Sequence, residues 1–283
     1  MIIRRPFLCS IFFVSLYSAG AEAASYRILL SSTTVRPGET LRVEIDGSLP
    51  ADHLRAAFLK KSFRFFVVGP NAQRALIGVP LGSPAGTFLL RVRSKNSAAD
   101  LAVEEVLVAS RTYTIENVNF SPEKTALMLS EHRESALIHK TAQIDSPEQF
   151  WEGVFSAPVK GPVIGEFGLK RVRNGTIDAG FHKGIDLRAD AGTPVLAANA
   201  GLVRIAAPLK AHGRTALIDH GQGVMTIYLH MSSLMVKPGQ HVVKGQTIGK
   251  VGSTGLSTAP HVHWQVFVHS VPVDPTPWTE TEF

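Results

Sequence analysis

Residues 261–266, His-Val-His-Trp-Gln-Val, decide how the C-terminal half of this chain is interpreted. A short apolar run bounded by turn residues and rich in β-branched and aromatic side chains is typical of a β-strand. In a strand, residues i and i+2 point to the same face, with Cα atoms about 6.6 Å apart. His261 and His263 can therefore enter one cleft side by side.

A second pair of candidate ligands stands upstream, in His182-Lys183-Gly184-Ile185-Asp186. In a fully extended strand His182 and Asp186 would be about 13 Å apart, too far to share a metal, but Gly184 permits a bend. Two imidazoles and one carboxylate suit Zn²⁺, and three protein ligands leave a fourth position for water, as in catalytic sites. The spacing does not say which of His261 and His263 is the ligand.

A further histidine, His230, lies between these two patterns in Tyr228-Leu229-His230. Either pattern alone occurs often by chance. Because the patterns occur together, and eight of the 11 histidines lie beyond residue 180, a metal site is the favoured interpretation of this region.

The region from about residue 155 to residue 275 resembles the LytM/M23 family of zinc metallopeptidases, the lysostaphin-like endopeptidases. The resemblance rests on many short blocks in the same order: residues 167–168, 182–187, 191–195, 219–221, 228–232, 236–240, 245–249, 252–255 and 260–263. It implies a C-terminal LytM-type antiparallel β domain, assigned here to residues 153–283. It also implies hydrolysis of peptide bonds in the stem peptides or cross-links of bacterial peptidoglycan.

Residue by residue, the resemblance implies that His182, Asp186 and His263 bind one Zn²⁺ per chain. It implies that His230 and His261 are the catalytic histidines outside the ligand set, which orient or deprotonate water and stabilise the oxyanion. Zinc lowers the pKa of its water toward about 7, and a neutral imidazole can accept a proton near that pH.

Two positions depart from the family pattern. Ala259 precedes Pro260 where the family commonly has Gly, and Gln265 stands where it commonly has Glu. Neither position is a ligand in the family. If Gln265 replaces an acid that orients a histidine, we expect metal affinity or rate to fall.

The other polar candidates have ordinary interpretations. His220 precedes Gly221 and should end a strand, and His212, His241 and His269 are expected to be surface positions. Asn174 is interpreted as a turn residue, with a substrate contact or a temporary fourth zinc ligand as the alternative.

Two other function classes compete with a peptidase. A non-catalytic LytM-like adaptor would bind the wall or activate another wall hydrolase, but such domains typically lack part of the His/Asp set that this chain keeps. A biotinyl or lipoyl carrier would explain residues 236–252, yet it needs an exposed lysine at a hairpin tip, usually in Met-Lys-Met, and that tripeptide is absent. Zinc-dependent peptidase activity is therefore the main expectation.

Residues 24–117 have a different pattern of apolar runs and turns from the C-terminal region. Short apolar runs at 26–30, 40–45, 62–68, 87–93 and 102–108 alternate with turns such as Arg36-Pro37-Gly38. This spacing predicts an N-terminal antiparallel β-sandwich. Residues 35–40 resemble a turn of bacterial immunoglobulin-like modules, which would make this domain a spacer or a wall-docking module.

Residues 118–152 are predicted to form a short helical connector. Ser121-Pro122-Glu123 and Ser146-Pro147-Glu148 both carry helix-start signals. The segment has enough apolar residues to pack on a neighbour. We hypothesise that it packs against the catalytic domain and narrows the cleft of that domain. The alternatives are that it is an ordinary linker or that it helps the protein to dock on the wall.

Residues 1–23 have the pattern of a secretory signal peptide. Arg4 and Arg5 precede an apolar run at residues 7–19, and Ala21-Glu22-Ala23 is a cleavage signal. Ordinary secretion and twin-arginine export both remain open. Cleavage after Ala23 would remove Cys9, the single cysteine of the chain, which argues against a disulfide or a Cys-type zinc site in the mature protein.

The composition limits the remaining possibilities. With 45% hydrophobic and 18% charged residues, the chain is too apolar to be disordered. The net charge of +6 comes without a dense Lys/Arg cluster, so nucleic acid is not expected as a partner. We expect an exported monomer that is not membrane-spanning after signal cleavage. It would act on peptidoglycan peptides in the periplasm or outside the cell.

Overall fold

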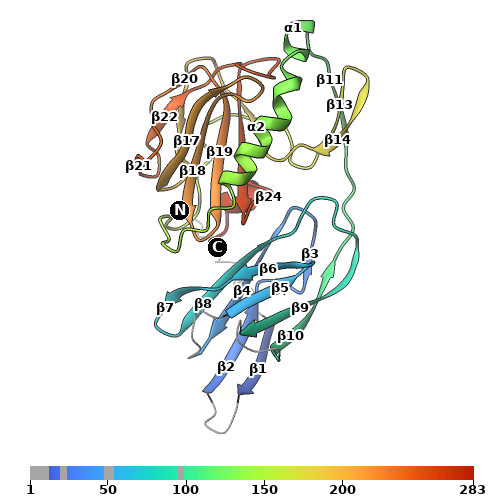
Figure 1. Cartoon of the computed structure of the whole chain (residues 1–283), viewed down its shortest axis with the longest axis vertical. Helices are drawn as coiled ribbons and strands as arrows, with labels where there is room; N and C mark the ends of the chain where they lie inside the picture. Colours follow the sequence, from blue (N-terminus) through green and yellow to red (C-terminus); the bar gives the residue numbers. More distant parts are fainter. Residues whose placement is uncertain (1–12, 20–23, 48–53, 95–98) are drawn as a thin grey trace, which may run out of the picture. The chain divides into compact units, whose positions relative to one another are not determined.

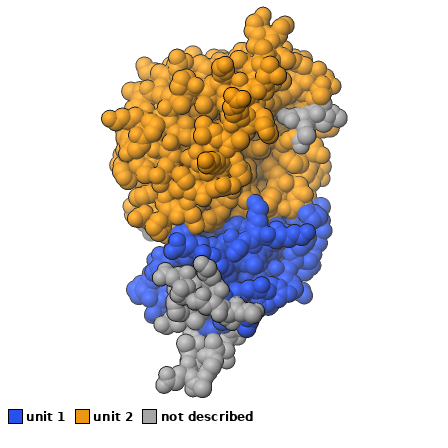
Figure 2. Space-filling view, in the orientation of Figure 1, with its two compact units in different colours: residues 1–36, 40–77, 84–110 blue, residues 37–39, 78–83, 111–283 orange. Residues whose placement is uncertain are grey.

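The computed structural model describes residues 13–19, 24–47, 54–94 and 99–283, and these are mainly strands (Figure 1). The chain divides into two compact units (Figure 2): unit 1 is residues 1–36, 40–77 and 84–110, and unit 2 is residues 37–39, 78–83 and 111–283. The predicted fold class, mainly β with antiparallel sheets, is confirmed.

Unit 1 consists of two five-stranded sheets, ordered β1-β2-β4-β8-β7 and β3-β10-β9-β5-β6. The strands are β1 Phe13–Ala19, β2 Ala24–Leu30, β3 Thr34–Val35, β4 Thr40–Asp46, β5 Leu54–Phe58, β6 Lys61–Arg64, β7 Phe66–Gly69, β8 Ala72–Gly78, β9 Gly86–Ser94 and β10 Asp100–Val108. The short β3 pairs with β10 in parallel. The two sheets agree with a sandwich, whereas kinship with immunoglobulin-like modules stays a prediction.

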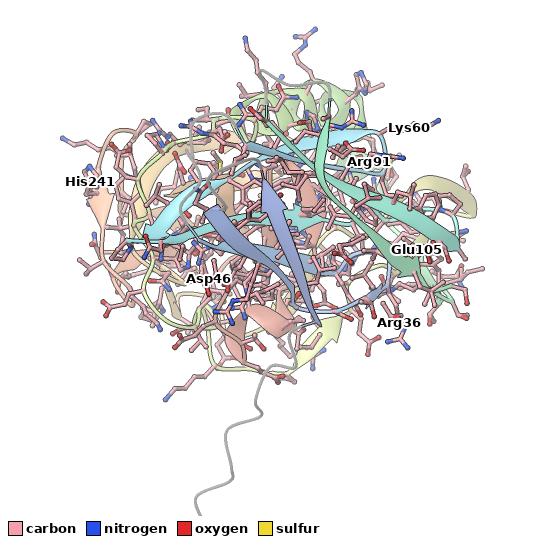
Figure 3. The ribbon with its side chains drawn as sticks, turned by 90° about the horizontal axis from the view of Figure 1, so that it is seen from below. Arg36, Asp46, Lys60, Arg91, Glu105 and His241 are labelled. Carbon is pink, nitrogen blue, oxygen red and sulfur yellow. The ribbon has the colours of Figure 1, made fainter. Side chains whose placement is uncertain are left out.

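Alternation along the strands builds the core of unit 1. In β4, Leu41, Val43 and Ile45 are fully buried, because every second side chain of a strand points to the same face. Strand β10 likewise exposes Glu105, which Figure 3 labels at the surface of the unit. The predicted run at residues 62–68 is wrong as one strand, because it is divided into β6 and β7.

The segment interpreted as a signal peptide is only partly described. Residues 1–12 and 20–23, with Cys9, the two arginines and the cleavage signal, lie outside the described residues. Residues 13–19 form β1 and pair with β2, so cleavage after Ala23 would remove β1 from the first sheet. Within the described ranges, helices that are long and apolar enough to cross a membrane are absent.

Unit 2 contains the C-terminal domain. An eight-stranded sheet runs β12-β15-β23-β19-β18-β17-β21, with β24 beside β23, and two three-stranded sheets have the orders β16-β22-β20 and β11-β13-β14. The strands are β11 Ile115–Val118, β12 Val163–Gly165, β13 Lys170–Arg173, β14 Thr176–Phe181, β15 Ile185–Arg188, β16 Pro194–Leu196, β17 Gly201–Leu209, β18 Gly213–Gly221, β19 Val224–Met231, β20 Ser233–Leu234, β21 His241–Val242, β22 Thr247–Lys250, β23 His261–Val268 and β24 Val271–Val273. A 3₁₀ turn, Thr276–Thr279, follows β24.

The centre of the large sheet is buried on both faces. Every residue of β19 and of β23 is buried, as expected for strands covered on each side. In the register across β15, β23 and β19, Asp186 lies opposite His263, and His263 lies opposite Leu229. The sheet thereby sets Asp186 and His263 side by side, with Leu229, the residue before His230, on the next strand.

The connector belongs to unit 2 and is partly helical. Helix α1, Pro122–Thr125, begins at Ser121, whose side chain accepts from the Lys124 N–H as predicted for an N-cap. Helix α2, Met128–Thr141, lies along β18 and β19 (Figure 1). Its Ile138, with Ala142 just beyond it, enters a core cluster of Ile205, Leu217, Met225, Ile227, Leu229 and Phe267.

The second predicted helix start, at Ser146, is wrong. The Ser146 hydroxyl donates to the Asp219 carboxylate at 2.7 Å, and its carbonyl accepts from the Gln222 N–H at 2.7 Å. Gln149 then forms a β-bridge with Gly221. These contacts tie the segment to the C-terminal end of β18, so the groups that would cap a helix are already used.

Candidate metal centre

Three buried side chains meet where β15 and β23 pair. Asp186 Oδ1 lies 2.9 Å from His263 Nδ1 and 3.1 Å from His182 Nε2, and these two nitrogens are 2.9 Å apart. Each of the three residues offers one ligand atom, and these atoms all lie within 4.8 Å of one another. The structure thus brings together the three residues expected to be ligands, whereas His261 Nε2 lies farther from Asp186 Oδ1, at 3.7 Å.

Gly184 allows this meeting for a reason that spacing alone does not give. A Cβ at residue 184 would lie 2.3 Å from the Trp264 carbonyl oxygen and 2.8 Å from His263 Nε2. Its φ is not in the left-handed region. Glycine is therefore required here by the close approach of β23, more than by a bend.

The outer nitrogens of the two imidazoles contact oxygen acceptors. His182 Nδ1 lies 2.7 Å from the Glu166 carbonyl, and His263 Nε2 lies 3.5 Å from Gln265 Oε1. In the tautomers that donate from these outer atoms, His182 Nε2 and His263 Nδ1 are unprotonated and face Asp186, as metal binding requires. Such outer contacts commonly fix the tautomer of metal-binding histidines, so the donor set fits a zinc ion.

Gln265, one of the two departures from the family pattern, therefore keeps a contact with a candidate ligand. Its amide oxygen can accept the same hydrogen bond as a carboxylate, though a charged acceptor would bind more strongly. The other departure, Ala259, acts through its backbone, because its carbonyl lies 2.8 Å from His261 Nδ1. A glycine at 259 could make the same contact.

Burial and hydrogen bonding set the charges of this group. Burial lowers the pKa of His263 to about 4, so its imidazole is neutral at pH 7. Burial alone would raise the pKa of Asp186. In the tautomers that carry a proton on His182 Nε2 or His263 Nδ1, hydrogen bonds to the carboxylate outweigh burial and hold that pKa well below its usual value. The site therefore presents a neutral nitrogen and an anionic oxygen, the forms that bind a cation.

His230 and His261 form a second pair beside the first. Their ring centroids are 4.9 Å apart. His230 Nδ1 lies 2.8 Å from the Thr254 carbonyl, and His261 Nδ1 contacts the Ala259 carbonyl and the Ser257 hydroxyl. Each ring thus has its Nδ1 occupied, which leaves Nε2 as the atom that can exchange a proton.

The backbone of His230 is strained, with φ of 65°. A non-glycine residue in this left-handed region costs of order 1–3 kcal/mol and persists only where surrounding contacts hold it. Here its N–H donates to the His212 carbonyl at 3.1 Å. Burial, together with His261 and His263, also lowers the pKa of His230 well below its usual value, so its ring is neutral.

The remaining candidates lie outside this cluster. His220 lies one residue before the end of β18, near the strand end predicted for it, and burial lowers its pKa to about 4. His212, expected at the surface, is partly exposed, with 15% of its side chain accessible and its Nδ1 2.8 Å from Glu134 Oε2 of α2. Asn174 is a turn residue with φ of 49°, and its side chain binds Phe120 N and Thr125 Oγ1.

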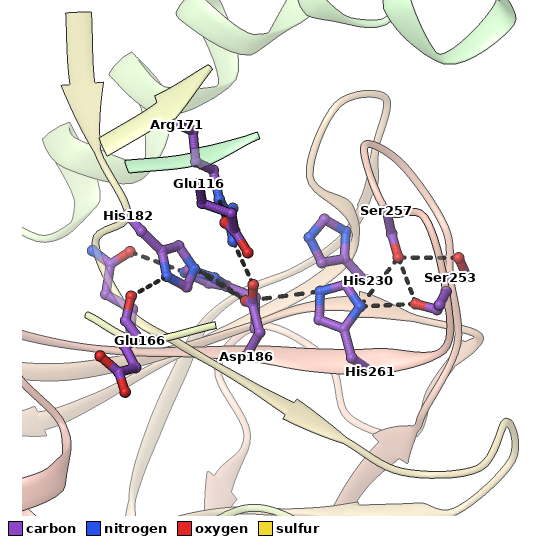
Figure 4. A network of polar contacts seen from close by, with 12 residues as sticks. Glu116, Glu166, Arg171, His182, Asp186, His230, Ser253, Ser257 and His261 are labelled. Atoms are coloured by element: carbon purple, nitrogen blue, oxygen red, sulfur yellow. Dashed lines mark hydrogen bonds and ion pairs between the residues drawn. The ribbon is translucent and has the colours of Figure 1, made fainter. Parts of the chain in front are cut away.

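Sequence reasoning missed Arg171, which makes an ion pair with Asp186 at 2.6 Å. Arg171 also pairs with Glu116 at 2.8 Å, and Figure 4 shows both side chains on the same side of Asp186. No motif marks Arg171 or Glu116, because their meeting depends on the pairing of two strands that are far apart in the sequence.

Comparison with known proteins agrees with this geometry. The family model described as Peptidase family M23 matches residues 180–275. The peptidoglycan DD-endopeptidase ShyA of Vibrio cholerae is 36% identical over 115 residues, which are 41% of this chain and 27% of ShyA. The DD-carboxypeptidase/endopeptidase Mpg of Neisseria meningitidis is 40% identical over 95 residues, 34% of this chain and 22% of Mpg.

One solved structure is similar over most of the chain. A crystal structure of a peptidase M23 from Pseudomonas aeruginosa covers 86% of this chain and 94% of its own, with 28% identity and a TM-score of 0.63. In contrast, this chain matches only about a quarter of the length of the two curated relatives.

Proposed function

We propose that this chain, which contains a peptidase family M23 domain, is an exported zinc metalloendopeptidase that hydrolyses peptide bonds of bacterial peptidoglycan. The observation that carries the proposal is the buried group of His182, Asp186 and His263, with the separate pair His230 and His261 beside it. The names of the relatives support peptidoglycan as the substrate.

The ligand set would consist of His182 Nε2, Asp186 Oδ1 and His263 Nδ1. Polarisation of the scissile carbonyl and acidification of water are the chemistry that zinc supplies when it is bound at such a site. The protein's own part is to hold these three atoms together before the substrate arrives.

His230 and His261 would move the proton. Because both Nδ1 atoms contact oxygen acceptors, Nε2 is the atom of each ring that would accept a proton from the attacking water and return it to the leaving amine. Once protonated, either ring can also stabilise the negative oxygen of the tetrahedral intermediate.

The metal assignment is tested by elemental analysis of the full chain after mild dialysis. We expect close to one zinc per chain, and we expect His182→Ala and Asp186→Ala each to lose most of it. Full retention of zinc in both variants would refute the ligand set.

The division of roles is tested with His230→Ala and His261→Ala. Both should keep zinc and lose hydrolysis by on the order of 10²-fold or more. If His261→Ala lost zinc and His263→Ala kept it, the roles of the two histidines would be reversed.

The substrate is tested by mass spectrometry of purified cross-linked muropeptides after digestion. New cleavage products that require His261 would support an endopeptidase and identify the bond. A protein that binds zinc and sacculi but releases no product would instead be an adaptor. Export is tested by sequencing the mature N-terminus, which should begin at Ala24.

A further inference from the structure

The two oxygens of Asp186 have different partners. Oδ1 faces His182 and His263 at 3.1 and 2.9 Å. Oδ2 accepts a hydrogen bond from Arg171 Nη2 at 2.6 Å, as the dashed contacts of Figure 4 show. The carboxylate is therefore oriented: Oδ1 is directed to the other two candidate ligands, here called with Asp186 the metal group, and Oδ2 is directed away from them.

Arg171 is itself held in place by the strand preceding the connector. Its Nε donates to Glu116 Oε2 at 2.8 Å. Strand β11 pairs in parallel with β13, and the register sets Glu116 directly opposite Arg171. The planar guanidinium thus uses Nε for Glu116 and Nη2 for Asp186, a fixed arrangement of donors that lysine cannot reproduce.

Gly165 of β12 closes the other side of the carboxylate. A Cβ at residue 165 would lie only 2.6 Å from Asp186 Oδ2, and the register pairs Gly165 with Asp186. Oδ2 therefore fits between the backbone of Gly165 and the guanidinium of Arg171, and the Asp186 carboxylate has little room to rotate.

We propose that Arg171, oriented by Glu116, is a positioning residue that fixes the Asp186 carboxylate so that Oδ1 faces the metal group. This inference rests on the proposed metal site. Hydrogen bonds behind a ligand set its orientation, and their loss commonly lowers metal affinity by about 10–100-fold. The pair is unlike a surface ion pair of little effect, because the side chain of Asp186 is only 9% exposed.

The sign of the effect separates positioning from simple charge neutralisation. A nearby cation weakens the attraction of a carboxylate for a metal, so removing a merely neutralising arginine would tighten zinc binding. Removing a positioning arginine frees the carboxylate to rotate and weakens binding. The proposal therefore predicts a direction as well as a size.

The inference also extends the metal centre beyond the region recognised by the family model. That region begins at residue 180, whereas Arg171 lies in β13 and Glu116 in β11. The ligand geometry would then depend on chain that precedes the peptidase domain.

The test measures the zinc affinity of the full chain by competition with a chromophoric chelator. We expect Arg171→Met to weaken zinc binding by about 10–100-fold and Glu116→Ala to weaken it in the same direction by a smaller factor. Arg171→Lys, which keeps the charge without this arrangement of donors, should restore only part of the loss.

The matched control is the next ion pair along the same strand. Arg173, two residues further along β13, uses Nη1 to bind Glu131 Oε2 at 2.7 Å. Arg173→Met should leave zinc affinity within about twofold of wild type, since it removes an equal charge at a similar place.

Unchanged or tighter zinc binding in Arg171→Met would overturn the proposal, and so would an equal loss in Arg173→Met. Tryptophan fluorescence of each metal-free variant shows whether it is folded. If Arg171→Met does not fold, Glu116→Ala decides alone, because it leaves the arginine in place. A wild-type chain that binds no zinc would refute the proposed metal site, a result distinct from failure of this inference.

Discussion

Truncation of Ile138 to alanine tests whether α2 is a structural part of unit 2. Ile138 is 6% exposed and packs into the cluster formed by β17, β18, β19 and β23. The change deletes three carbon atoms, which at about 0.8 kcal/mol for each buried CH₂ costs about 2.4 kcal/mol. The cavity left behind adds to this, and such changes cost about 2–5 kcal/mol in total. We therefore expect a loss of about 3 kcal/mol in the unfolding free energy of unit 2.

The chain supplies both the probe and the control. Its three tryptophans, Trp151, Trp264 and Trp278, all lie in unit 2 and are buried, so urea unfolding followed by tryptophan fluorescence reports on that unit. With a typical slope, the midpoint should fall by on the order of 1 M urea. Leu129→Ala, on the same helix but 90% exposed, should change stability by less than about 0.5 kcal/mol. Equal, small shifts in both variants would show that α2 is a detached linker and would refute the packing argument.

Three further predictions follow from neighbouring contacts. Glu134→Ala should destabilise unit 2 by about 1–3 kcal/mol, because its carboxylate accepts the N–H groups of residues 210–212. It should also slow hydrolysis without loss of zinc. His220 binds a proton below about pH 6.5 when unfolded but only below about pH 4 when folded, so stability should fall by about 3 kcal/mol as the pH drops through that window. Urea titrations of His220→Gln should show a shallower dependence over the same range, and an unchanged slope would remove His220 as the cause. Lys124→Ala breaks the contacts of α1 with the Ser253 and Gly255 carbonyls. If α1 restricts access to the site, hydrolysis of sacculi and of a small soluble cross-linked peptide should both become faster, whereas unchanged rates would leave α1 as a linker.

The candidate site was largely predictable because its pattern is local. The two-residue repeat set His261 and His263 on one face, and the spacing around Gly184 suggested where Asp186 could join them. What spacing could not provide is register. Only the pairing of β15 with β23 sets Asp186 opposite His263, and that pairing joins segments more than 70 residues apart.

The missed strands show the same limit in unit 1. Strand β8 was not predicted because Gln73 and Arg74 interrupt its apolar run, although both are buried in the structure. Strand β5 was not predicted either, because no turn signal marks where it ends. Local patterns identify strands whose polar residues face solvent, and they fail where tertiary contacts bury polar side chains.

Ser121 and Ser146 show how identical local signals can have different outcomes. Each serine is followed by proline and glutamate, and each should start a helix by its intrinsic preference. Ser121 does so, whereas the hydroxyl of Ser146 is bound by Asp219. A helix-start signal is thus a weak preference, which a buried charged partner overrides.

The segment before residue 150 cannot be treated as a detachable regulator. Its Glu116 binds Arg171 behind the metal group, its Ile138 fills the core, and its Glu134 binds the loop that contacts His230 through a backbone hydrogen bond. A truncation at residue 150 would remove all three contacts at once. Lower activity of that fragment would then reflect lost packing and lost ligand orientation, and it would say nothing about occlusion. Single substitutions in α1, which leave these three contacts in place, are therefore the informative test of whether the connector narrows the cleft.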